Sequence, residues 1–326
     1  MPAFSANPTD LSEDIGYELD AIDYLRFTLC KQVDGPGNGM SMTIGDLTPE
    51  GKQRCQVFMS GRMNTSDEAV RAALNRFRPL AFSATFKLQD MIVEWILGAN
   101  GVMVWAFKEK KKAYNRLRAG SKLAEPDLFS AYPNMAIAFW ELYKFLIDYR
   151  GAVTHSGGVT LELDGTIVIV RDGQTLRFTA ADQASYMRAV CIIAKIFTGQ
   201  VFRNEFLDTQ VQADLYVLQP YHQQTGCLVQ SARLEALIVH VQPSHIESHT
   251  PLTVTLDFDH FRRTMESTFQ ISVGGRLFYS VEIIVHAGSG RDYTWRLPVE
   301  SVPIGVVTMR EGDPKYDQFL GISTTA

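Results

Sequence analysis

The sequence predicts an α+β protein in which a helical domain precedes a β-rich domain. First, apolar residues recur at three- and four-residue steps in the stretch that ends at His155, which is the period of an amphipathic helix. Second, residues 159–178 alternate between apolar and polar around two Asp-Gly turns, a pattern typical of hairpins and of a small β-meander. Third, short β-type runs separated by turns dominate from about residue 205 onward, which indicates an antiparallel sheet or sandwich.

These patterns divide the chain into three expected parts. An acidic N-terminal segment, residues 1–66, is expected to pack on a helical domain of residues 67–200 that contains the meander. Residues 201–326 are expected to form the antiparallel β-rich domain. The boundary near residue 200 rests on the change of pattern alone, because no long linker separates the two parts.

Composition narrows the class of protein. The 326 residues are 46% hydrophobic and 21% charged, which is ordinary for a globular chain with a sizeable core. A net charge of −5 argues against nucleic-acid binding through bulk positive charge, although it leaves room for a local basic site. The four cysteines form no CxxC pair, so we expect neither a zinc knuckle nor a disulfide framework, and a cytoplasmic location. We find no signal-peptide pattern and expect no membrane span.

The N-terminal segment is acidic, with nine acidic residues against two basic ones among the first fifty. A solvated acidic face is favoured over a metal cluster formed by its aspartates. Residues 17–33 fit either a helix or a pair of strands, and Gly35-Pro36-Gly37-Asn38-Gly39 is a break.

Helices are expected over residues 67–77, 80–97, 136–155 and 181–198. Pro79 either interrupts the first of them or opens the second, and Gly157-Gly158 stops the third. Strands are expected in the C-terminal part over residues 215–218, 234–241, 252–258, 269–273, 276–285 and 293–297.

Residues 108–122 form the one basic stretch, with seven basic residues against Glu109. Because aromatic residues are interleaved with the cations, one interpretation is a groove that neutralises phosphates and stacks bases. The alternative is a solvated helix face whose aromatic residues point inward. The first interpretation predicts nucleic-acid contacts from Lys108, Lys110, Lys111, Lys112, Arg116 and Arg118.

Arg150 and His155 lie in the last turns of the 136–155 helix, directly before its glycine stop. The negative end of the helix dipole favours a protonated imidazole there. Arg150-x4-His155 at a helix end resembles the R-x4-6-H motif of the HEPN (higher eukaryotes and prokaryotes nucleotide-binding) family, and residues 67–199 are similar in layout to its helical bundle. The alternative is that both side chains only satisfy the last carbonyls of their helix.

The resemblance implies a metal-independent endoribonuclease of the toxin or phage-defence kind, without a cofactor. His155 would move protons at the 2′-hydroxyl, Arg150 would hold the scissile phosphate, and the product would be a 2′,3′-cyclic phosphate. The implied partners are RNA, a second copy of the chain and a regulatory or antitoxin protein. Candidate auxiliary groups are Asp148, Tyr149, Thr154, Ser156, Asp90 and Glu94.

One position departs from the family pattern. Many members carry a polar residue, commonly Asn, directly after the arginine, whereas this chain has Gly151. A second hypothesis is therefore a non-catalytic HEPN-like module that binds RNA, a nucleotide or a partner protein. A third is a metal-dependent hydrolase built on His245 and His249, which are four residues apart but bracketed by prolines, so that a loop is expected there.

Overall fold

The computed structural model describes residues 3–26, 28–29, 38–47, 53–61, 68–155, 158–201, 203–224, 236–241, 243, 245–269, 278–286, 291–298 and 301–324. The chain divides into two compact units. One is mainly helical and comprises residues 1–36, 62–203 and 207–231; the other is rich in strands and comprises residues 37–61, 204–206 and 232–326. Within the described part of the chain, no helix is long and apolar enough to cross a membrane.

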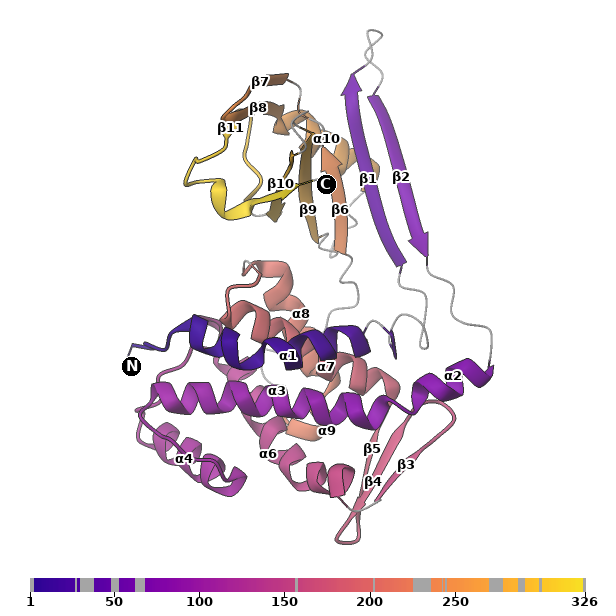
Figure 1. Ribbon diagram of the computed structural model, residues 1–326, viewed down its shortest axis with the longest axis vertical. Coiled ribbons are helices and arrows are strands. Elements are labelled where there is room, and N and C mark those ends of the chain that lie inside the picture. The colour runs from indigo at the N-terminus through magenta and orange to yellow at the C-terminus, as the bar shows by residue number, and fades with distance from the viewer. Residues whose placement is uncertain are drawn as a thin grey trace. The chain divides into compact units, whose positions relative to one another are not determined.

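The helical unit is built around two long helices, α3 and α6 (Figure 1). Both helices pack against each other, and α3 also contacts α1 and α7. The elements of this unit are α1 (Pro8–Arg26), α2 (Glu68–Asn75), α3 (Arg78–Ala99), α4 (Phe107–Ala119), α5 (Asp127–Ala131), α6 (Pro133–His155), β3 (Val159–Leu161), β4 (Ile167–Arg171), β5 (Gln174–Phe178), α7 (Ala180–Phe197), α8 (Glu205–Val217, apart from its first two residues) and α9 (Gln219–His222).

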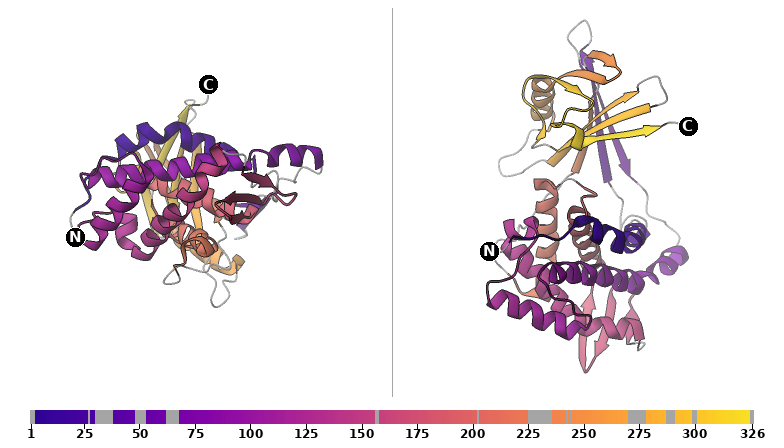
Figure 2. Two further views of the ribbon diagram at one scale, coloured as in Figure 1. Left: turned by 90° about the horizontal axis from the view of Figure 1, so that it is seen from below. Right: turned by 60° about the vertical axis from the view of Figure 1, so that its left-hand side comes forward.

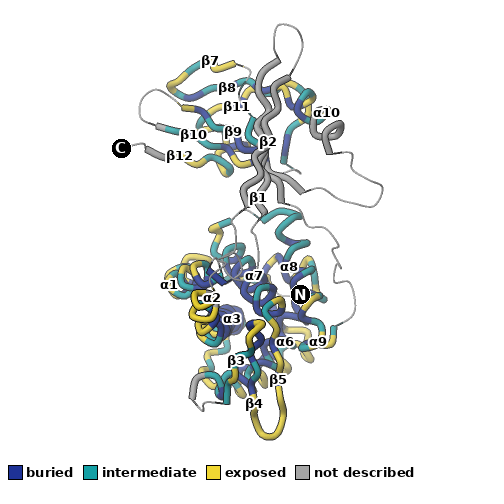
Figure 3. The backbone as a smooth tube through the Cα atoms, turned by 90° about the vertical axis from the view of Figure 1, so that its right-hand side faces the viewer, coloured by how far each residue is buried: buried dark blue, intermediate teal, exposed yellow. Residues whose placement is uncertain are grey.

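The core of the helical unit follows the apolar periodicity of the sequence. On α6, Phe139, Leu142, Tyr143 and Leu146 are at most 1% exposed, at the steps of three and four expected of a buried helix face. Figure 3 shows the buried stretches along α3 and α6, and the exposed turn between β4 and β5. Pro79 lies in the first turn of α3, where its missing N–H has no cost. The four expected helices are thus confirmed, with α2 beginning at Glu68 and α6 at Pro133.

The N-terminal helix α1 belongs to the helical unit. Leu11, Ile15, Leu19 and Ile22 recur at three- and four-residue steps and are at most 1% exposed. Asp23 pairs with Lys195 of α7, so this acidic residue anchors the helix rather than facing water alone. Residues 17–26 are therefore helical and do not form a pair of strands, because α1 buries an apolar face against the core.

The meander, the small group of strands in the helical unit (Figure 2), packs against α6 through β4. A buried arginine holds its first turn. Arg78 is 0% exposed, and its Nε donates to Asn75 Oδ1 at 2.7 Å. Its Nη1 donates to Gln183 Oε1 at 3.3 Å, and Gln183 Nε2 donates to the Gly165 carbonyl at 3.0 Å. Gly165 has φ +85°, and an added Cβ would lie 2.6 Å from Arg78 Nε. The first turn of the meander is thereby fastened to the starts of α3 and α7.

We expect Gly165→Ala to lower the free energy of unfolding by about 1–3 kcal/mol more than Gly173→Ala does. Both glycines have positive φ, so both substitutions carry a left-handed strain of about 1–2 kcal/mol. A Cβ at Gly173 meets nothing within 4 Å, whereas at Gly165 it displaces the Arg78 guanidinium. Urea unfolding of both variants measures the difference, and equal losses would contradict the packing of Arg78 on this turn.

His222, the last residue of α9, is a buried histidine held in its neutral form. It is 4% exposed, its Nε2 donates to the Leu215 carbonyl at 2.6 Å, and its Nδ1 accepts from the Gln224 N–H at 3.0 Å. A proton on Nδ1 would oppose that N–H. Burial lowers the pKa of the His222 imidazole below its ordinary value, against a smaller raising effect of the Leu215 carbonyl.

Acid is therefore expected to destabilise the protein through His222. Because the folded-state pKa lies below that of the unfolded chain, the unfolded state takes up the proton first as the pH falls below about 6.5. The contribution of His222 to stability is complete above that pH and declines toward the lower, folded-state pKa. Urea unfolding of the wild type and His222→Gln at pH 7.5, 6.5 and 5.5 checks this. The free energy of unfolding should fall less between pH 7.5 and pH 5.5 in His222→Gln than in the wild type. An equal fall in both proteins would contradict the role of His222.

The described residues of the second unit form two sheets. A six-stranded sheet has the order β12-β10-β9-β6-β1-β2, and a three-stranded antiparallel sheet has the order β11-β8-β7. Side chains of β8, β9 and β10 form a core with Phe258 and Phe261 of α10. The elements are β1 (Asn38–Leu47), β2 (Gln53–Gly61), β6 (Ala236–Val241), β7 (His245–His249), β8 (Leu252–Asp257), α10 (Phe258–Phe269), β9 (Phe278–His286), β10 (Arg291–Pro298), β11 (Val306–Arg310), the 3₁₀ helix η3 (Asp317–Phe319) and β12 (Leu320–Thr324).

The α+β class is confirmed, but the expected arrangement differs in the placement of β1 and β2, in the strand directions of the large sheet and in two of the expected strands. Residues 38–47 and 53–61 form an antiparallel pair of strands, β1 and β2, that belongs to the second unit, because β1 also pairs in parallel with β6. The large sheet is consequently mixed rather than antiparallel, since β6 also runs parallel to β9. Residues 215–218 were expected as a strand but lie at the end of α8 and in the following turn, because Leu215 and Leu218 complete the helical core. Of the expected strand 269–273, Phe269 ends α10 and the rest lies outside the described residues.

Candidate functional site

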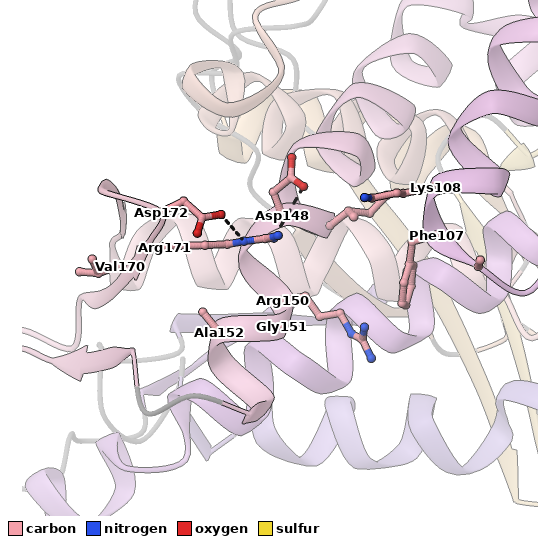
Figure 4. Close-up of a pocket in the computed structure, with 11 residues that line it drawn as sticks. Phe107, Lys108, Asp148, Arg150, Gly151, Ala152, Val170, Arg171 and Asp172 are labelled. Atoms are coloured by element: carbon pink, nitrogen blue, oxygen red, sulfur yellow. Dashed lines mark hydrogen bonds and ion pairs between the residues drawn. The ribbon is translucent and has the colours of Figure 1, made fainter.

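Arg150 lies near the C-terminal end of α6, where its guanidinium stacks on an aromatic ring from α4. The Arg150 Cζ atom is 4.3 Å from the centroid of the Phe107 ring (Figure 4). Phe107 packs in turn on Phe86 of α3, with 5.8 Å between the ring centroids. A guanidinium over an aromatic face is held by electrostatic attraction while its N–H edge can still bind an anion. Three helices thus fix the direction of this side chain.

An open pocket of about 670 Å³ lies beside Arg150. Its walls come from the start of α4, the last turns of α6 and the turn between β4 and β5, namely residues 106–108, 147–148, 150–152 and 170–172. Ile147, Arg150 and Gly151 share one face of α6, because residues three and four apart in a helix are neighbours. The motif arginine therefore borders a cavity large enough for a small ligand.

The opposite wall of the pocket carries a second arginine, from β4. Arg171 Nη1 lies 3.6 Å from Asp148 Oδ1, and its Nε lies 3.2 Å from Asp172 Oδ2 (Figure 4). Asp148 is a predicted auxiliary residue that does line the pocket, although it is engaged with Arg171 there. Lys108 lines the pocket from the α4 side and is exposed. The rim therefore offers both cations and carboxylate acceptors.

Lys110 belongs to a buried charge cluster instead of the basic surface. It is 1% exposed, and its Nζ lies 2.7 Å from Asp90 Oδ1 and 2.5 Å from Glu94 Oε1. Tyr143 donates a further hydrogen bond to Asp90. The prediction that Lys110 contacts nucleic acid was wrong, because the carboxylates of α3 draw it into the bundle. Asp90 and Glu94 do not line the pocket and are better described as structural partners of Lys110 than as auxiliary groups.

The other predicted cations of α4 are exposed. Lys112 pairs with Glu109 at 2.8 Å, and Arg118 donates to the Tyr114 hydroxyl at 3.4 Å. The expected interleaving of aromatic residues is met only in part, because Tyr114 is buried and stacks on Trp140. Trp105, just before α4, is 78% exposed. The exposed cations are Lys108, Lys111, Lys112, Arg116, Arg118 and Lys122.

The remaining motif residues divide between buried and undescribed positions. Tyr149 is 7% exposed and its hydroxyl donates to Gln174 Oε1 at 3.4 Å, so it fastens α6 to β5. The backbone of α6 continues through His155, whereas Ser156 and the side chains of Thr154 and His155 lie outside the described residues.

The alternative histidine pair, His245 and His249, lies on the edge strand β7 instead of in a loop. Both residues are exposed. Among the described residues, no group of three or more metal-binding side chains is brought together.

No family model, curated protein or solved structure matches the chain. The site is therefore defined by its own residues. Arg150, Asp148 and Lys108, which line the pocket, have functional roles predicted from the sequence, whereas Arg171, Asp172 and Phe107 do not. Asp172-Gly173 was interpreted only as a turn, and nothing in its pattern indicated that this turn would face α6.

Proposed function

We propose that the chain is a metal-independent endoribonuclease of the HEPN class, of the toxin or phage-defence kind. The observation that carries the proposal is the position of Arg150, five residues before His155 at the end of α6 and on the rim of an open pocket. Exposed cations of α4 begin at that rim with Lys108 and continue along the helix. A phosphate at Arg150 would thus have further cations available for neighbouring phosphates.

The proposed reaction is an internal transfer of the phosphoryl group. The 2′-hydroxyl oxygen bonds to the adjacent phosphorus while the bond from phosphorus to the 5′ oxygen breaks, which leaves a 2′,3′-cyclic phosphate and a 5′-hydroxyl. His155 would act in one of the two proton transfers, by taking the proton from the 2′-hydroxyl or by giving one to the leaving 5′ oxygen, and water would act in the other. Arg150 would neutralise the charge that grows on the non-bridging oxygens. The reaction as a whole neither gains nor loses a proton or a charge, and it needs no metal ion.

The geometry of α6 supports a site shared between two copies of the chain. Five residue steps place the Cα atoms of Arg150 and His155 about 140° apart around the helix axis and about 7.5 Å apart along it. The two residues of one α6 helix therefore lie on different faces of that helix. An arginine from one protomer facing the histidine of the other would bring both to the same phosphate.

The deciding experiment is cleavage of a mixed RNA pool in excess EDTA by the wild type, His155→Ala and a control, His286→Ala. His286 is an exposed histidine of β9 in the second unit. We expect the wild type and the control to cleave, and His155→Ala to lose about 10²–10⁴-fold in rate while keeping its oligomeric state. Cleavage that persists in His155→Ala, or that EDTA alone abolishes, would contradict the proposal.

A non-catalytic binding module is the second candidate. Gly151 favours it, because it supplies no polar side chain next to Arg150. This candidate predicts RNA or nucleotide binding that depends on Arg150, without cleavage by a well-folded wild-type dimer. The same experiment, combined with a binding measurement, separates the two.

A further inference from the structure

Gly151 sits in α6 at a point where neither backbone nor packing requires glycine. A Cβ added at Gly151 would meet nothing within 4 Å, and its φ is not in the left-handed region. Glycine inside a helix is destabilising by roughly 0.5–1 kcal/mol relative to alanine. What the glycine does provide is open space, because it lines the pocket beside Arg150.

We propose that the pocket over Gly151 is a nucleobase subsite, which holds an unpaired base of the RNA strand whose phosphate lies at Arg150. The inference rests on the proposed function. It also explains why this chain has Gly151 where many HEPN members have a polar residue. The missing side chain after Arg150 makes room for a base.

The shape and lining of the pocket suit a base joined to a phosphate. A volume of about 670 Å³ exceeds what a single phosphate fills and falls within the range of small-molecule sites. Ile147, Ala152 and Val170 give apolar lining for a flat ring, while Arg150 and Lys108 supply positive charge at the rim. Apolar contact with the ring and cations for the phosphate are the two components of single-strand recognition.

The side of the pocket that carries Arg171 supplies hydrogen-bonding groups for the edge of a base. Asp148 and Asp172 present acceptors for ring N–H and exocyclic amino groups, and Arg171 presents donors for ring nitrogens and carbonyls. A base paired in a duplex cannot enter such a pocket, so the site should select single-stranded RNA.

The test is calorimetric titration of the full chain with nucleoside 3′-monophosphates and with inorganic phosphate, at one low salt concentration. The variants are Gly151→Ala, Gly151→Val and Gly151→Leu, which fill the pocket stepwise. Gly16→Leu is the matched control, because Gly16 also lies inside a helix, α1, and a Cβ there also meets nothing within 4 Å. Each substitution replaces a helical glycine, so circular dichroism is expected to show intact helices throughout.

We expect the wild type to bind at least one nucleotide tenfold or more tighter than phosphate. Gly151→Leu should lose at least tenfold in nucleotide affinity, Gly151→Val an intermediate factor, and Gly151→Ala and Gly16→Leu less than twofold. Phosphate affinity should change less than twofold in all four variants. Equal affinity of the wild type for nucleotide and phosphate, or unchanged nucleotide affinity in a folded Gly151→Leu, would overturn the subsite.

Cleavage assays on the same proteins separate the two proposals. Nucleotide binding that Gly151→Leu abolishes, in a wild type that does not cleave RNA, supports the subsite and rejects the ribonuclease. Conversely, RNA cleaved by Gly151→Leu at the wild-type rate and positions supports the ribonuclease and rejects the subsite.

Discussion

Replacing Arg150 with alanine is expected to lower the rate of RNA cleavage by about 10²–10³-fold, the usual effect of removing one donor that stabilises transition-state charge. The cleavage rate of Arg150→Lys should lie between those of the wild type and Arg150→Ala, because lysine keeps the positive charge but lacks the paired N–H donors of arginine. Stability should fall by about 0.5–1 kcal/mol through the loss of the contact between the Arg150 cation and the Phe107 ring at this partly exposed site. Single-turnover kinetics with urea unfolding on the same samples measures both quantities.

The matched control is Arg116→Ala, which removes the same side chain from the exposed face of α4. It should weaken RNA binding slightly and leave the single-turnover rate at saturating RNA unchanged. Equal rate losses for both arginines would show that Arg150 contributes bulk charge and nothing specific.

A mixture of Arg150→Ala and His155→Ala proteins tests the shared site. If the two residues of one site come from different protomers, each mixed dimer contains one intact site. Random exchange of protomers makes half of the dimers mixed, so the mixture should recover about a quarter of wild-type activity. A mixture as inactive as its components, after exchange has been verified, would place both residues of a site in one protomer.

Lys110→Met is expected to lower the free energy of unfolding by about 3 kcal/mol, the lower end of the effect of breaking a buried ion pair, because it leaves two partly buried carboxylates without their shared cation. The Lys110 Nζ atom lies within 2.8 Å of both Asp90 oxygens and contacts Glu94 at 2.5 Å. Lys111→Met is the matched control, since the neighbouring lysine is exposed and its loss should change stability by less than about 0.5 kcal/mol. Urea unfolding at pH 7 measures both variants.

The same pair of variants distinguishes the buried cation from the surface cations in binding. Lys111→Met should reduce the slope of log affinity against log salt by about 1, because one phosphate contact is lost. Lys110→Met, measured where it is folded, should leave the slope unchanged. A large stability loss in Lys111→Met, or a changed slope in Lys110→Met, would contradict the assignment of the two lysines.

Much of the helical unit could be predicted from its sequence because local patterns decide it. The apolar steps of α6, the proline at the start of α3 and the Asp-Gly turns of the meander are each sufficient to predict their own element. The strand expected at residues 215–218 failed for a related reason. Its run of apolar residues fits a buried strand and a buried helix equally well, and only packing on the core separates them.

Pairings between distant segments could not be predicted in this way. The parallel pairing of β1 with β6 joins residues almost two hundred positions apart, and nothing local in residues 38–47 indicates their partner. Lys110 and Lys111 are indistinguishable in sequence, yet one lies against Asp90 and the other faces solvent.

At the candidate site, too, local patterns predict some features and only tertiary packing decides the others. The sequence by itself determined that Arg150 and His155 lie at the end of an amphipathic helix and that a basic segment precedes it, because helical period and charge are local properties. The tertiary structure decided that Phe107 supports Arg150, that Arg171 and Asp172 face it across a pocket, and that Gly151 leaves that pocket open. These contacts depend on how α4, α6 and the meander pack together, which is set by the shared core and not by any one segment.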